Sequence, residues 1–126
     1  MKAVIIAAAA AAAALSLGAC ASTPPGEAFD PAGTAFTGFV RVTEGEFQLY
    51  PREAQLRSPF ARPCVSGVLP LNEQRTAREL SGRKVTFTGR AVRWPGGVAL
   101  EHEGSTVRNT CGGDHVILAQ SVSVLR

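Results

Sequence analysis

The chain has few of the residues from which most catalytic and metal sites are built. Its 126 residues include two histidines, three cysteines, one tryptophan and one tyrosine. The sequence contains no phosphate-binding loop, zinc-protease motif, nucleophile elbow or dinucleotide-binding fingerprint. No cysteine sits in a C-x-x-C motif, the usual signature of a thiol oxidoreductase. These absences argue against an enzyme, and we expect no cofactor.

Only one long hydrophobic run is present, and it lies at the N-terminus. Met1-Lys2 is followed by an apolar stretch, residues 4–17, that only Ser16 interrupts. Such a run behind a short basic start is typical of a secretory signal peptide, and it is too short to span a bilayer as a stable helix. The run ends in Leu17-Gly18-Ala19-Cys20, which is an aliphatic residue, two small residues and a cysteine.

This tetrapeptide resembles the lipobox of bacterial lipoproteins. The resemblance covers about the first twenty residues and implies diacylglycerol on the sulfur of Cys20, removal of residues 1–19, and usually N-acylation. The implied partner is the lipid bilayer, because several acyl chains make release from a membrane slow. In this family an Asp after the cysteine tends to retain the protein in the inner membrane. Ala21 therefore implies the outer membrane, facing the periplasm. An ordinary secreted protein with a chance cysteine is the alternative.

The two remaining cysteines suggest a disulfide. Lipidation of Cys20 leaves Cys64 and Cys111 in a compartment that favours disulfides. A bridge between them would close a loop of 46 intervening residues and stabilise the fold by about 4 kcal/mol in the chain-entropy account. That is comparable with the whole stability of a small domain. Two separate buried thiols, or a reactive pair, are the alternatives.

A linker separates the lipid-bearing cysteine from the folded part. Residues 20–35 include three prolines, two glycines and small polar residues, without a period of 2 or 3.6. We expect a flexible tether with a mean span on the order of 20 Å. The folded domain is then expected over residues 36–126.

From Phe36 onward the hydrophobic pattern predicts strands and one short helix. Strands are expected at residues 36–43, 47–50, 64–71, 83–94 and 116–124, with a loop over residues 51–63. A helix is expected over residues 73–80, capped by Asn72 and ended by Gly82. Residues 98–109 are expected to form a hairpin around Gly104.

Two strands contain an irregularity. Val92 and Trp94 fall out of phase with Val85 and Phe87, and a bulge near Gly89 would explain the slip. In the last strand Val116, Leu118, Val122 and Val124 are expected on one face, interrupted by Gln120.

The element order β-β-β-α-β-β resembles the OB-fold, a five-stranded Greek-key barrel. The resemblance rests on this order and on the glycine-centred segment GRKVTFTGRAV, residues 82–92. It implies that the third and fifth strands are parallel neighbours, which would bring Cys64 close to Cys111. The expected fold class is therefore mostly β: a small five-stranded OB-like barrel with one short helix. Another small antiparallel barrel or a sandwich is the alternative.

The candidate binding residues are arginines. Eleven arginines and Lys84 face ten acidic residues after removal of residues 1–19, and this net charge of +2 is too small to indicate nucleic acid binding. An arginine fork suits carboxylates and phosphates, so we expect an anionic envelope component or an envelope protein as partner, and no nucleic acid. The candidates are Arg52, Arg57 and Arg62 before the third strand, Arg90 and Arg93 beside Trp94, and Arg108. A solvated basic surface with Trp94 in the core is the alternative.

The histidines do not form a recognisable site. Neighbours in a strand point to opposite sides, so Glu101-His102-Glu103 is expected to be a solvated hairpin tip rather than a metal site. Asp114-His115 is expected to cap a turn, and an enzyme built on this pair with an arginine is the least favoured hypothesis.

The sequence as a whole predicts a non-catalytic, membrane-anchored envelope lipoprotein that binds a ligand or partner. The alternative is a periplasmic inhibitor of lysozyme-like enzymes, because inhibitors of that kind are also small, disulfide-linked barrels. Their inhibitory loop has a Ser-Gly-x-x-Tyr motif, of which only Ser66-Gly67 is present here.

Overall fold

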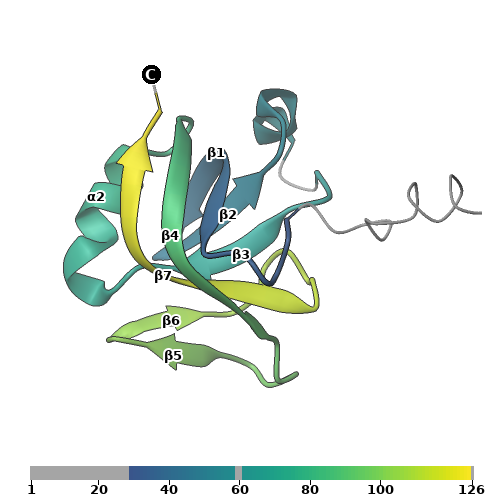
Figure 1. Ribbon diagram of the computed structural model, residues 1–126, viewed down its shortest axis with the longest axis vertical. Coiled ribbons are helices and arrows are strands. Elements are labelled where there is room, and N and C mark those ends of the chain that lie inside the picture. Colours follow the sequence, from purple (N-terminus) through teal and green to yellow (C-terminus); the bar gives the residue numbers. More distant parts are fainter. Residues whose placement is uncertain (1–28, 59–60, 126) are drawn as a thin grey trace, which may run out of the picture.

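The computed structural model describes residues 29–58 and 61–125, which form a closed five-stranded barrel with a short helix and a hairpin beside it (Figure 1). The strand order is β1-β2-β3-β7-β4, and β4 pairs with β1 to close the barrel. β3 and β7 run parallel, and the other barrel pairs are antiparallel. The barrel strands are β1 (Ala35–Thr43), β2 (Glu46–Tyr50), β3 (Val65–Val68), β4 (Lys84–Arg93) and β7 (His115–Val124). The predicted OB-like barrel is confirmed, and the alternative of an all-antiparallel barrel or a sandwich is wrong.

The barrel interior is filled by the inward-facing residues of every strand and by two residues of the helical segment. In β1 the predicted alternation is confirmed, since Phe36 and Val40 are buried and Thr37 is exposed. The ring of Phe47 stacks on that of Phe87 with centroids 3.7 Å apart. We call this set the main core: Phe36, Val40, Phe47, Leu49, Leu69, Ala77, Leu80, Val85, Phe87, Ile117 and Ala119.

Short helices occupy two of the connections. η1 (Glu53–Arg57) lies between β2 and β3, where only a loop was expected. Between β3 and β4 the turn η2 (Leu71–Glu73) runs into α2 (Gln74–Glu79). The expected cap at Asn72 is wrong, because this residue lies inside η2 and no side chain caps α2. The segment ends as predicted at Gly82, whose φ of 91° favours glycine.

The register of β4 and β7 breaks where predicted, but the extra residue lies on β7. Thr88 pairs with Ser121 and Gly89 with Ala119, which leaves Gln120 without an opposite residue. β7 therefore changes phase at Gln120. The prediction that its four spaced apolar residues share one face is wrong. Its later valines, Val122 and Val124, pack against the main core, whereas Val116 and Leu118 point to the outside of the barrel.

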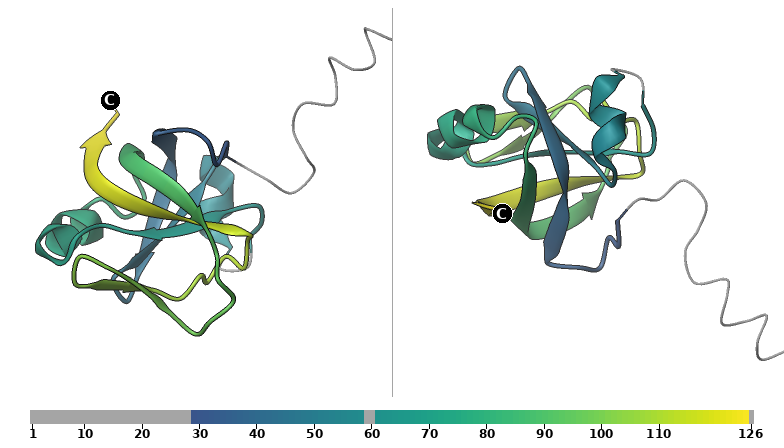
Figure 2. Two further views of the ribbon diagram at one scale, coloured as in Figure 1. Left: turned by 60° about the horizontal axis from the view of Figure 1, so that its bottom comes forward. Right: turned by 90° about the horizontal axis from the view of Figure 1, so that it is seen from above.

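A hairpin covers this outer side. β5 (Leu100–His102) and β6 (Ser105–Val107) pair around a turn at Gly104, as predicted. The hairpin lies below the barrel in Figure 1, and the left view of Figure 2 brings it forward. It encloses an outer core of Val68, Val107, Val116 and Leu118, with Val92, Trp94 and Leu100 packed against it. Val92 and Trp94 are therefore out of phase with Val85 and Phe87 because they face the outer core, and not because β4 contains a bulge.

His102 ties the hairpin to the bulge. It is buried, and its Nε2 lies 2.9 Å from the carbonyl oxygen of Ala119. The expectation of a solvated tip is thus wrong for His102, although Glu101 and Glu103 are exposed. His102 therefore holds the β5–β6 hairpin against β7.

The described chain begins close to β4. Phe29, which the expected linker includes, packs against the main core. The amide of Gly89 donates to the carbonyl of Thr34 at 3.0 Å. No helix within residues 29–58 and 61–125 is long and apolar enough to cross a membrane. The expected signal peptide and Cys20 lie outside the described residues.

Candidate functional site

A polar pocket of about 400 Å³ opens between the β1–β2 turn, α2 and the β5–β6 hairpin. In OB-folds the β1–β2 loop and the loop between the last two barrel strands flank the ligand-binding face. The β5–β6 hairpin belongs to that second connection, since it joins β4 to β7. The pocket therefore lies where this architecture commonly binds ligands. Its lining is almost entirely polar: Thr43, Glu44, Glu46, Gln74, Gly104, Thr106, Arg108 and Thr110.

The near wall of the pocket is a tight two-residue turn. Glu44 and Gly45 have φ values of 53° and 84°, and Thr43 pairs directly with Glu46. Two positive φ values in succession define the hairpin turn whose twist matches that of its strands. The turn holds Glu44 at the pocket rim with its side chain 81% exposed.

The opposite wall is held by a relay of hydrogen bonds from α2. The amide Nε2 of Gln74 donates to Oγ of Ser105 at 2.7 Å, and that hydroxyl donates to the carbonyl of Leu69 at 2.5 Å. At the hairpin tip the amide of Leu71 donates to the carbonyl of Glu103 at 3.0 Å. These bonds join the hairpin to the end of β3 and fix the width of the pocket.

The floor is organised by Glu46, a buried carboxylate. Its two oxygens accept the consecutive backbone N–H groups of Arg108, Asn109 and Thr110 at 2.6, 2.9 and 3.0 Å. Nε2 of Gln48 donates to it as well, at 3.0 Å. Successive N–H groups curved around one centre form an anion-binding nest. Here the nest is filled by a carboxylate of the same chain.

The protonation of Glu46 follows from these bonds. Burial by itself raises the pKa of a carboxyl group. Hydrogen bonds from the Thr110 side chain, from the Arg108 and Thr110 backbone and from Gln48 outweigh burial, and the pKa of Glu46 lies below its usual value. The group is therefore ionised at neutral pH, and its hydrogen bonds hold the pocket floor in place.

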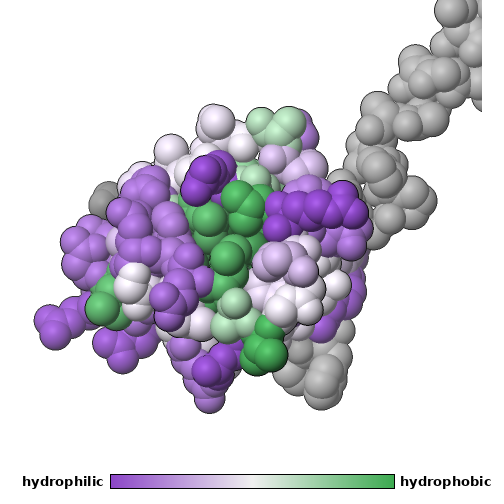
Figure 3. Space-filling view, turned by 90° about the horizontal axis from the view of Figure 1, so that it is seen from below, coloured by the Kyte–Doolittle hydropathy of each residue, from purple (hydrophilic) through white to green (hydrophobic). Residues whose placement is uncertain are grey.

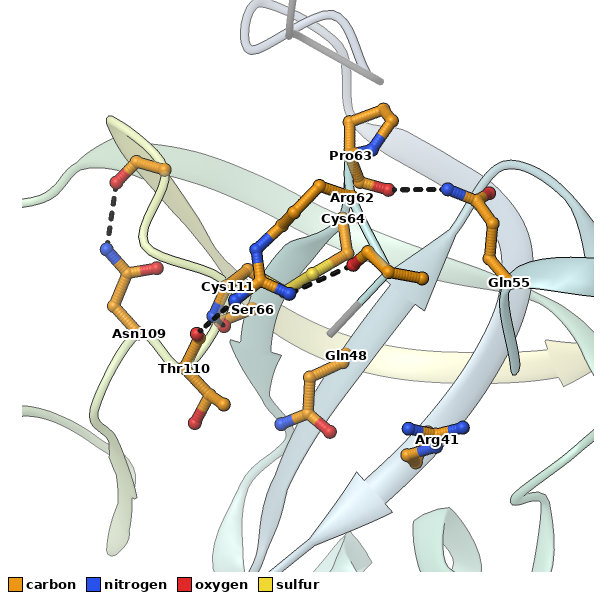
Figure 4. Close-up of a disulfide and its surroundings, with 12 residues drawn as sticks. Arg41, Gln48, Gln55, Arg62, Pro63, Cys64, Ser66, Asn109, Thr110 and Cys111 are labelled. Carbon is orange, nitrogen blue, oxygen red and sulfur yellow. Dashed lines mark hydrogen bonds between the residues drawn. A yellow bond between two sulfur atoms is a disulfide. The ribbon is translucent and has the colours of Figure 1, made fainter. Parts of the chain in front are cut away.

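The segment that follows β6, the return limb of the hairpin (residues 108–111), is also fixed covalently. Cys64 and Cys111 form the expected disulfide, with Cα atoms 5.6 Å apart (Figure 4). Oγ of Ser66, which is fully buried, accepts the amide of Cys111 at 2.8 Å. The bridge thus joins the start of β3 to the residue that follows the Glu46 nest.

The six predicted arginines lie on different elements. Arg108 lines the pocket; its guanidinium is 68% exposed and lies 3.8 Å from Glu44. Arg62 donates to the carbonyls of Ala61 and Thr110 at 2.9 and 3.2 Å, beside the disulfide (Figure 4). It therefore supports Thr110, a pocket-lining residue, through the backbone of that residue. The other four are exposed: Arg52 and Arg57 flank η1, and Arg90 and Arg93 lie on β4.

The residues of the least favoured enzyme hypothesis, Asp114 and His115, take part in backbone pairing between β7 and the end of β4. Asp114 is exposed, and its backbone carbonyl accepts the amide of Trp94 at 2.8 Å. His115 pairs with Arg93 across the β4–β7 ladder. Ser66-Gly67, the only match to the lysozyme-inhibitor motif, is buried within β3 and not presented on a loop. Within the described residues no group of three or more His, Cys, Asp or Glu side chains could hold a metal ion.

The pocket offers a mixture of donors and acceptors. The hydroxyl of Thr106 can donate and accept. The hydroxyl of Thr43 donates to Oε1 of Gln48 at 3.3 Å and the Gln74 amide donates to Ser105, so these two side chains offer the pocket chiefly their oxygens as acceptors. Glu44 and Arg108 form only a loose exposed pair. Two carboxylates and one guanidinium line it, so the pocket does not concentrate positive charge. No protein-family model matches the chain, and no match to a curated protein or a solved structure was found.

Proposed function

We propose that this chain is a membrane-anchored lipoprotein of the cell envelope whose barrel is a non-catalytic binding module. The pocket between the β1–β2 turn and the β5–β6 hairpin is its ligand site, and this pocket is the observation that carries the proposal. The anchor is the acylated Cys20, which follows Leu17-Gly18-Ala19. The location is the periplasmic side of the outer membrane.

The arrangement of the pocket supports binding rather than catalysis. Its buried carboxylate accepts hydrogen bonds from three backbone N–H groups, from Gln48 and from the Thr110 side chain, and a carboxylate occupied in this way has no lone pair directed at a substrate proton. Its walls are fixed by the Ser105 relay and by the disulfide. A rigid pocket lowers the entropy lost on binding.

The lining chemistry favours a hydroxyl-rich ligand. A sugar hydroxyl both donates and accepts, and the pocket presents both kinds of partner around its rim. OB barrels bind oligosaccharides with these same loops. In the envelope such a ligand is a glycan, and the glycan strands of peptidoglycan are the natural candidate. The anionic partner suggested by the arginines remains a separate prediction, because only one of the six lines the pocket.

An NMR titration tests the ligand site directly. The mature chain, starting at residue 20 with Cys20→Ser, is titrated with soluble disaccharide-peptide fragments of peptidoglycan. We expect the largest amide shifts at Thr43, Thr106 and Thr110, which line the pocket. Thr106→Val keeps the shape of a half-buried strand residue and removes its hydroxyl. Loss of one hydrogen bond to the ligand should weaken binding about three- to tenfold.

The control is a threonine on another part of the barrel. Thr88 is an exposed strand residue of β4 outside the pocket, so Thr88→Val should bind the fragments as the wild type does. Shifts that avoid the pocket residues, or equal weakening by both valine variants, would contradict the assignment of the pocket as the glycan site.

A further inference from the structure

The loop that joins β4 to β5 exposes an apolar side chain to solvent. Val98 is 89% exposed, in a loop that follows Pro95-Gly96-Gly97. On either side of this loop Trp94 and Leu100 are only half-buried against the outer core. A space-filling view of the molecule from below shows apolar side chains gathered in the middle of the face, surrounded by hydrophilic ones (Figure 3). We call Trp94, Val98 and Leu100 the apolar loop face.

We propose that the apolar loop face docks onto the surface of the phospholipid bilayer to which the chain is tethered. The inference rests on the lipid anchor of the proposed function, but not on the ligand pocket. It assigns the domain a fixed side toward the membrane instead of free rotation on its linker.

The length of the tether and the place where it joins the barrel put the loop within reach of the membrane. Nine residues lead from Cys20 to Phe29, which limits their extended length to about 30 Å. The described chain then reaches β4, where the carbonyl of Thr34 accepts the amide of Gly89. From Gly89 to Trp94 the strand advances by five residues, or about 17 Å. The loop thus begins about 17 Å along β4 from the residue that contacts Thr34, which is less than the extended length of the tether.

The chemistry of the face matches the interfacial zone of a bilayer. Tryptophan prefers the headgroup level, with its ring partly in the apolar region. Arg90 is exposed on the same side of β4 as Trp94 and can bind a lipid phosphate while its stem lies along the apolar surface, whereas Arg93, also exposed, points to the other side. Two acidic residues, Glu101 and Asp114, adjoin the loop and reduce the local positive charge. Apolar contact therefore contributes more to docking than charge does.

Docking of this kind needs only weak intrinsic affinity. The tether confines the domain to a thin layer above the bilayer, where the effective concentration of membrane surface is high. One exposed valine and a half-buried tryptophan give marginal binding on their own, but the anchor makes that binding intramolecular.

Tryptophan fluorescence tests the inference, because Trp94 is the only tryptophan of the chain. The lipidated mature protein is reconstituted into vesicles of phosphatidylethanolamine and phosphatidylglycerol. A fraction of the phospholipid is brominated near the glycerol end of its acyl chains. We expect bromine to quench Trp94 in the wild type. Val98→Asp places a charge in the loop and should lower the docked population roughly tenfold and remove the quenching.

The matched control is Leu125→Asp, an exposed leucine at the other end of the β4–β7 ladder, next to Lys84. It should leave the quenching unchanged. All three proteins should float with the vesicles, since the anchor is intact in each. Flotation without quenching of the wild type, or equal loss of quenching in both variants, would overturn the docking inference alone. Failure of the wild type to float would overturn the lipid anchor and the docking inference with it.

Discussion

At the scale of single residues, the pocket depends most on Glu46, which sequence reasoning did not find. In β2 the alternation places Glu46 and Gln48 on the outward side, where polar residues normally meet solvent. They are buried because the return limb of the hairpin crosses β2. Nothing in the local sequence indicates that crossing. The disulfide between the two remaining cysteines was the favoured sequence prediction, ahead of separate thiols, because lipidation of the third cysteine and an oxidising compartment were expected, and the structure contains this bridge.

Glu46→Gln should destabilise the fold by about 2–4 kcal/mol, because it replaces an ionised acceptor of several N–H donors by a neutral amide. Urea denaturation at neutral pH measures the loss. Glu79→Gln, on the exposed side of α2, should change stability by less than about 0.5 kcal/mol. Equal stability of the two variants would mean that the nest does not support the fold.

The lowered pKa of Glu46 also makes the stability of the fold depend on pH. The pKa of Glu46 is lower in the folded state than its ordinary value of 4.5, so the unfolded chain takes up the proton first as pH falls. The stability from Glu46 is therefore complete above pH 4.5 and declines as pH falls through the lower folded-state pKa. The stability of Glu46→Gln should fall less steeply than that of the wild type over this range.

At the scale of elements, all five predicted barrel strands are present, but the third ends at Val68 and not at residue 71, and two strands had a face misassigned. Period 2 located the strands and the hairpin because one side of each strand is buried. The pattern could not separate the main core from the outer core. Val85 and Phe87 face the main core, whereas Val92 and Trp94 pack against the outer core on the other side of β4. The interruption at Gln120 was visible in the sequence, yet its interpretation required the pairing with β4.

At Gly89 the backbone of β4 leaves no room for a side chain against β7. A Cβ there would overlap the carbonyl of Leu118 and the Cα of Ala119. We expect Gly89→Ala to destabilise the fold by roughly 1–3 kcal/mol through overpacking against backbone. At Gly97 a Cβ would meet nothing, so Gly97→Ala should be neutral or slightly stabilising. Thermal unfolding of the two variants provides the comparison, and an unaffected Gly89→Ala would contradict the close approach.

At the scale of the whole molecule, the fold follows from element order, while the ligand site follows from how the hairpin lies over the barrel. The parallel contact of β3 with β7 was predicted through the resemblance of the element order to the OB-fold, and the structure contains it. The pocket was not predicted. Its walls come from the β1–β2 turn, α2 and the hairpin, which only the tertiary structure brings together. The arginine pattern located one lining residue, Arg108.

The proposed function requires the chain to be an anchored envelope lipoprotein with an oxidised barrel. The most direct test is the intact mass of the full-length protein after expression in a two-membrane bacterium and extraction from its membranes, before and after reduction. The proposed function predicts a chain that begins at Cys20, carries acyl groups, and gains two hydrogen atoms on reduction as the Cys64–Cys111 bridge opens. A chain without acyl groups, or one whose mass does not change on reduction, would contradict it.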